Sequence, residues 1–69
     1  MLTPDAKLLR TLLARYASAR IADAERSTPA SRRELADVTY TLCVTTATRT
    51  TEDAIAAAEA VLSEERAAA

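Results

Sequence analysis

The chain contains no glycine, and its only prolines are Pro4 and Pro29. Glycine and proline are the strongest breakers of regular structure, so these two prolines mark the places where new elements begin. The segments that follow them carry apolar residues at a spacing of three to four. We therefore expect an all-α fold: a small three-helix bundle in one domain, residues 1–69, with helices at about 4–26, 31–46 and 51–66.

The first helix has the clearest signals. Thr3, Pro4 and Asp5 supply an N-cap, a proline in the first turn and an acid near the positive end of the helix dipole. An apolar stripe follows, which Leu8 and Ile21 widen and whose other members are Leu9, Leu12, Leu13, Tyr16, Ala17 and Arg20. The basic residues Lys7, Arg10 and Arg15 leave this stripe for solvent.

A short connector at residues 27–31 separates the first two helices, which implies that they are antiparallel neighbours. Two caps are available for the second helix: Thr28 before Pro29, or Ser31 in a capping box with Glu34. The third helix begins after Thr50, with acids next to the cap. Its narrow apolar stripe consists of Ala54, Ile55, Ala58, Val61 and Leu62, and its trailing alanines are expected to fray.

The middle segment allows two interpretations. As a helix it places Leu35, Val38, Leu42 and Thr45 on one side; as a strand, residues 38–45 alternate with a period of two. The threonine, valine and tyrosine content favours a strand. A single strand needs a partner, however, and no other segment of the chain resembles one. We expect a helix, and a strand only if two chains pair this segment with each other.

The core of such a bundle is thin. The hydrophobic share is 49%, but 17 of these residues are alanine and only 13 are leucine, isoleucine or valine. Cys43 is the single cysteine and there is no histidine, so an internal disulfide is excluded and a zinc site is implausible. Oligomerisation remains as a source of stability. Tyr40 and Val44 are adjacent on a helix and lie off its core side, so we expect a homodimer, or a protein partner, at these two residues.

Other candidate residues have an ordinary structural explanation beside the functional one. Cys43 is either a reactive thiol or a small buried hydrophobe, and no histidine is present to activate it. Arg32 and Arg33 could contact phosphate, but they precede Glu34 and Asp37 and fit a solvated helix start. Arg49 is a candidate contact for an anion or a partner carboxylate, and capping of the second helix is an equal alternative.

Residues 35–49, LADVTYTLCVTTATR, resemble a family of short actinobacterial proteins, mostly from Streptomyces, that is catalogued as a domain of unknown function. The family block is D-V-x-Y-T-L-C-V-[ST]-T-G-T-R, followed by a short alanine-rich helix. The resemblance implies an actinobacterial, cytoplasmic protein and brings no established activity. Ala47 stands where the family has glycine. If that glycine supplies a left-handed helix end, this chain must end the helix differently or strain Ala47.

The sequence favours a non-catalytic protein that acts through protein–protein interaction, with no catalytic residue, cofactor or metal. A net charge of -1 and the absence of a long apolar run argue against nucleic acid and membrane partners, and no signal peptide begins the chain. One alternative is a small dimeric enzyme or small-molecule-binding protein of the chorismate-mutase type, which would use Lys7, Arg10 and Arg15. Another is a helix-turn-helix module, although its recognition helix would begin with Glu52 and Asp53, which repel phosphate.

Overall fold

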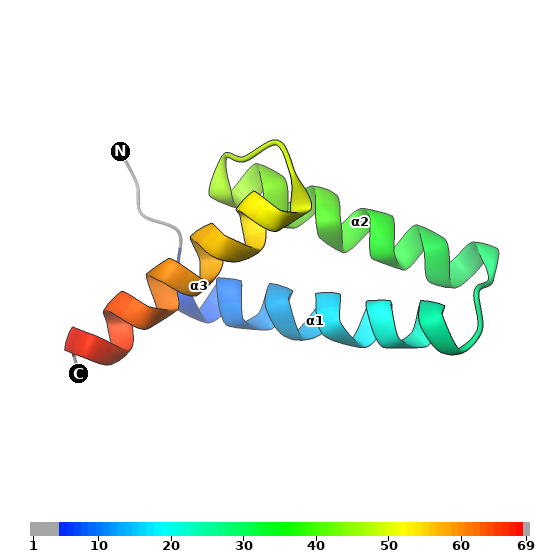
Figure 1. Cartoon of the computed structure of the whole chain (residues 1–69), viewed down its shortest axis with the longest axis horizontal. Helices are drawn as coiled ribbons and strands as arrows, with labels where there is room; N and C mark the ends of the chain where they lie inside the picture. Colours follow the sequence, from blue (N-terminus) through cyan, green and yellow to red (C-terminus); the bar gives the residue numbers. More distant parts are fainter. Residues whose placement is uncertain (1–4, 69) are drawn as a thin grey trace.

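The computed structural model describes residues 5–68 and contains three helices, α1 (Ala6–Glu25), α2 (Pro29–Thr46) and α3 (Thr51–Ala68). α1 and α2 form an antiparallel hairpin, and α3 returns across the hairpin at the end away from the α1–α2 connector (Figure 1). Each helix packs against the other two. The expected three-helix, all-α bundle is confirmed, and residues 38–45 lie within α2 rather than in a strand.

The predicted start of the first helix at residue 4 is slightly early. Asp5 is the N-cap: its backbone is extended, with φ -68° and ψ 124°, and its carboxylate accepts a hydrogen bond from the N–H of Lys7 at 3.3 Å. A short acidic side chain in this position satisfies one of the unpaired N–H groups of the first turn. The cap predicted at Thr3 lies outside the described residues.

The second helix begins at Pro29 and not at residue 31, because Thr28 is its cap. The hydroxyl of Thr28 accepts from the N–H of Ser31 at 3.0 Å, and Ser31 Oγ accepts from the N–H of Thr28 at 2.8 Å. Ser31 thus takes the role in the capping box that the sequence offered to Glu34. Pro29 occupies the first turn, where its missing N–H costs no hydrogen bond.

The third helix begins as predicted, after a cap in which Thr50 Oγ1 accepts from the N–H of Asp53 at 3.1 Å. It continues to Ala68, two residues beyond the predicted end. Alanine has the highest helix propensity of all residues. The trailing alanines therefore extend the helix beyond residue 66.

The core is as thin as the composition indicates. Within residues 5–68, eight hydrophobic side chains are buried and four of them are alanines; these are Ala6, Leu9, Leu12, Ala19, Val38, Leu42, Ala54 and Ala58. The predicted side of the middle helix is confirmed by Val38 and Leu42, which are fully buried. α3 contributes Ala54 and Ala58 to the core, both with no exposed surface. Side chains this small let the backbone of α3 lie close to the hairpin.

The predicted stripe of the first helix is wrong in part. Leu9 and Leu12 are buried, but Ala17 and Arg20 are exposed, as are Leu8 and Ile21, at 44% and 59%. The core side of α1 is exposed near the connector because α3 crosses the other end of α1 and does not cover this part (Figure 1). Leu8 is next to Leu9 in the chain and therefore about 100° around the helix from the buried side.

Candidate functional site

Within the described residues, the two large hydrophobic side chains with the highest exposed fractions lie on the outer side of α2. Tyr40 is 71% exposed and Val44 is 60% exposed. They are four residues apart, which places them one turn apart on the same side of the helix. Val38 and Leu42 each lie two residues earlier, roughly opposite on the helix, and both are fully buried. Burial of these two residues therefore directs Tyr40 and Val44 away from the bundle.

Charged residues continue this outer side toward the start of α2. Arg33, Asp37, Tyr40 and Val44 have spacings of four, three and four, so they form one line along the helix. All four residues are exposed. The line is apolar in its second half and carries one charge of each sign in its first half.

Arg49 lies in the connector between α2 and α3 and is exposed. The connector closes α2 with its own backbone: the N–H groups of Ala47 and Thr48 donate to the carbonyls of Val44 and Cys43. Backbone N–H groups thus cap the end of α2, which is the role that the sequence offered as the alternative for Arg49. Arg49 is not on the line formed by Tyr40 and Val44, so these predicted contact residues belong to different elements.

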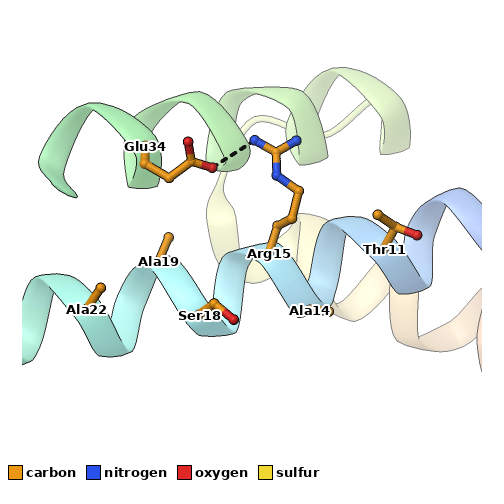
Figure 2. Close-up of a pocket in the computed structure, with 7 residues that line it drawn as sticks. All are labelled: Thr11, Ala14, Arg15, Ser18, Ala19, Ala22 and Glu34. Atoms are coloured by element: carbon orange, nitrogen blue, oxygen red, sulfur yellow. Dashed lines mark hydrogen bonds and ion pairs between the residues drawn. The ribbon is translucent and has the colours of Figure 1, made fainter. Parts of the chain in front are cut away.

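A shallow groove of about 530 Å³ runs between α1 and α2 (Figure 2). Its lining is mostly small, and consists of Thr11, Ala14, Arg15, Ser18, Ala19, Ala22 and Glu34. Arg15 Nη2 and Glu34 Oε1 lie 2.8 Å apart and bridge the two helices at the groove, with both side chains about half exposed. The charged groups of the groove thus neutralise each other.

The basic residues of α1 that could hold a dianion do not converge. Arg15 pairs with Glu34 on α2, whereas Arg10 Nη1 pairs with Glu65 Oε1 on α3 at 3.2 Å. The two guanidinium groups therefore reach toward different helices and are each held by a carboxylate. Among the described residues, Arg10 and Arg15 are therefore not brought together into one anion site.

A polar network at the α1–α2 connector was not found from the sequence. The half-buried carboxylate of Asp23 accepts hydrogen bonds from Ser31 Oγ at 2.8 Å and from Ser27 Oγ at 3.1 Å. Asp23 is seven residues after Tyr16, which places it on the inner side of α1. A charged residue on the inner side of a helix was the signal in the sequence that could have revealed the network. The network ties the end of α1 to the cap of α2 and is structural.

Cys43 is half-buried and packs against the core cluster that contains Leu42 and Val38. Its carbonyl oxygen accepts the N–H of Thr48 at 2.9 Å. The position agrees with the interpretation of Cys43 as a small hydrophobe at the edge of the core, although part of the side chain reaches the surface.

Comparisons with known proteins add the family and no activity. Within residues 5–68, none of the three helices is both long enough and apolar enough to cross a membrane. No curated protein and no solved structure matches the chain. One family model does match, over residues 1–65, and its description is "Protein of unknown function (DUF5133)". The chain therefore belongs to the DUF5133 family.

Proposed function

We propose that this protein is non-catalytic and acts through protein–protein interaction, and that it forms a homodimer through the outer side of α2. The observation that carries the proposal is the exposure of Tyr40 and Val44, at 71% and 60%, next to each other on one helix. Large exposed apolar side chains that adjoin one another are typical of interaction sites. Tyrosine in particular contributes strongly to protein interfaces.

The shape of the chain supports the same proposal. Its accessible surface is 5107 Å² for a mass of 7.4 kDa. A compact monomer of this mass exposes about 4200 Å², so the chain exposes roughly 900 Å² more. The radius of gyration is 12.7 Å, against about 11 Å for a compact domain of this length. The chain is therefore less compact than a typical monomer of its length, as expected of a subunit that buries part of its surface against a partner.

A two-fold axis perpendicular to α2, passing between Tyr40 and Val44, would place two copies of this helix antiparallel to each other. Tyr40 would then pack against the partner subunit's Val44, and the same contact would repeat on the other side of the axis. One self-complementary surface is sufficient for a closed dimer. Arg33 and Asp37 would lie at the polar edge of the contact, where charged residues are tolerated because they remain hydrated.

Sedimentation velocity over a range of concentrations tests the dimer. The parent protein should sediment as a dimer, and Val44→Glu should sediment as a monomer with unchanged far-UV circular dichroism, because a charge would be buried in the contact. Ile21→Glu is the matched control: Ile21 is 59% exposed and lies on α1, so this variant should remain dimeric. A monomeric parent at high micromolar concentration, or dissociation by the Ile21 change alone, would contradict the proposal.

We also propose that the protein is cytoplasmic and comes from an actinobacterium. The resemblance of residues 35–49 to the actinobacterial block supports this origin, as do eight arginines against one lysine and 17 alanines, a composition typical of GC-rich genomes. Fractionation of host cells, followed by detection with an antiserum, should recover the chain with the cytosol. Recovery with the membrane or the medium would contradict the assignment.

A further inference from the structure

The hairpin has a second unpartnered surface, on the side where α3 lies. α1 and α2 run side by side from the open end of the hairpin to the connector at residues 26–28. α3 covers this side only at the open end, and it then continues past the start of α1 (Figure 1). The half of the same side that adjoins the connector has no third helix over it.

Burial along each helix shows the same break. On α1, Leu9 is fully buried, whereas Arg20, three turns later and nearly in line with it, is exposed. On α2, Leu42 is fully buried, whereas Leu35, two turns earlier on the same side, is only half-buried. The core side of both helices is therefore less buried in the half next to the connector.

We define the vacant face as the uncovered part of this side. Its residues are Tyr16, Ala17, Arg20, Ile21 and Ala24 on α1, and Arg32 and Leu35 on α2. The α1 part spans about ten residues, or roughly 15 Å of helix. A helix of about three turns would therefore cover it. Tyr16 and Leu35 are half-buried and would supply the apolar centre of such a contact, and the exposed Ile21 would lie at its edge.

The charge of the vacant face is positive. Arg20 and Arg32 are exposed, and neither forms an ion pair within residues 5–68. Of the carboxylates around the connector, Glu34 pairs with Arg15, Asp23 accepts from Ser27 and Ser31, and Glu25 forms no ion pair within residues 5–68. A partner that covers this face therefore meets two exposed arginines that no carboxylate of the described chain pairs with, which favours an acidic partner.

The half of this side that α3 covers shows how the hairpin binds a helix. α3 carries five acidic residues and one arginine. Its small residues Ala54 and Ala58 pack into the hairpin, and Glu65 pairs with Arg10 at its edge. This side of the hairpin thus binds α3 through small apolar side chains in the centre and through a carboxylate that pairs with an arginine at the edge.

We propose that the vacant face binds an acidic amphipathic helix of another protein, which continues the layer of α3 toward the connector. Its apolar stripe packs on Tyr16, Ile21 and Leu35, and its carboxylates pair with Arg20 and Arg32. This is the helix-in-groove mode of recognition. The site is separate from the outer side of α2, so a homodimer and this complex can form at the same time, and each can fail without the other.

The test is an NMR titration of the ¹⁵N-labelled full chain with a synthetic peptide that has the sequence of residues 51–68. This peptide is the probe because α3 already binds the other half of the same side. Amide signals of Ile21 and Leu35 should shift, and those of Ala54 and Ala58 should not. A peptide in which the glutamates are replaced by lysines should cause no shift.

The double variant Arg20→Glu/Arg32→Glu should weaken the apparent Kd by about tenfold or more, because two attractive contacts become repulsive. Lys7→Glu is the control: Lys7 is an exposed base in the first turn of α1, at the end away from the connector, and its change should leave binding unchanged.

Three outcomes would overturn the proposal. The first is no shift at Ile21 and Leu35 at millimolar peptide. The second is a shift at Ala54 and Ala58, which would mean that the peptide replaces α3. The third is a concentration-dependent shift of Ile21 without peptide, which would mean that a second copy of the chain occupies the face. None of these results depends on the contact at Tyr40 and Val44.

Discussion

The N–H of Thr48 donates to the carbonyl oxygen of Cys43 at 2.9 Å, and this bond closes α2 around a residue in a left-handed conformation. That residue is Ala47, with φ 58° and ψ 43°; its own N–H donates to the carbonyl of Val44 at 3.3 Å. The two bonds together form a complete Schellman motif. Alanine thus occupies the position that favours glycine, and the strain foreseen from the sequence is present at Ala47.

Ala47→Gly should raise the free energy of unfolding by about 0.5–1 kcal/mol, because glycine has no Cβ to strain, while its extra chain entropy offsets part of the gain. The melting temperature should rise by several degrees. Ala60→Gly is the control, since Ala60 is exposed in the interior of α3. This change should lower the free energy of unfolding by about 0.5–1 kcal/mol. Equal losses in both variants would show that Ala47 is not left-handed.

Ser31→Ala should destabilise the protein by about 1 kcal/mol, because it removes the acceptor for the Thr28 N–H and the donor to Asp23. Urea unfolding followed by circular dichroism measures the difference. Ser63→Ala, at an exposed position of α3, is the matched change and should be neutral or slightly stabilising, since alanine is the better helix former. If both serine variants unfold at the same urea concentration, the connector network contributes nothing.

Ala58→Leu should destabilise the protein by about 1–3 kcal/mol, because Ala58 is fully buried between α3 and the hairpin and a larger side chain would push α3 outward. Ala60→Leu, two residues later and exposed, should change the free energy of unfolding by less than about 0.5 kcal/mol. Thermal unfolding of the two variants compares them directly. A similar small effect of both would mean that α3 does not pack closely at Ala58.

Local signals in the sequence predicted the helices and most of their ends. A cap side chain acts on N–H groups within three residues, so Thr28 and Thr50 could be recognised from their neighbours alone. The choice between Thr28 and Ser31 as the cap could not be made in this way. It depended on Asp23, eight residues before Ser31, which holds the Ser31 hydroxyl at the end of α1.

The candidate site was predictable in one part and not in another. The position of Tyr40 and Val44 outside the core follows from helical periodicity, because Val38 and Leu42 fill the other side of α2. Helical periodicity could not predict the vacant face. Ile21 and Arg20 continue the stripe of Leu9 and Leu13, and periodicity gives no sign that their exposure differs.

The sequence by itself determined that the chain folds into three helices, that Thr50 caps the third and which side of α2 is apolar, because these properties depend on residues within one or two turns. Only the tertiary structure decided how far α3 extends along the hairpin. That extent depends on the angle at which the α2–α3 connector, with its left-handed Ala47, directs α3 across α1 and α2. Because of that angle Leu9 is buried and Arg20 is exposed, although the two residues lie nearly in line on α1.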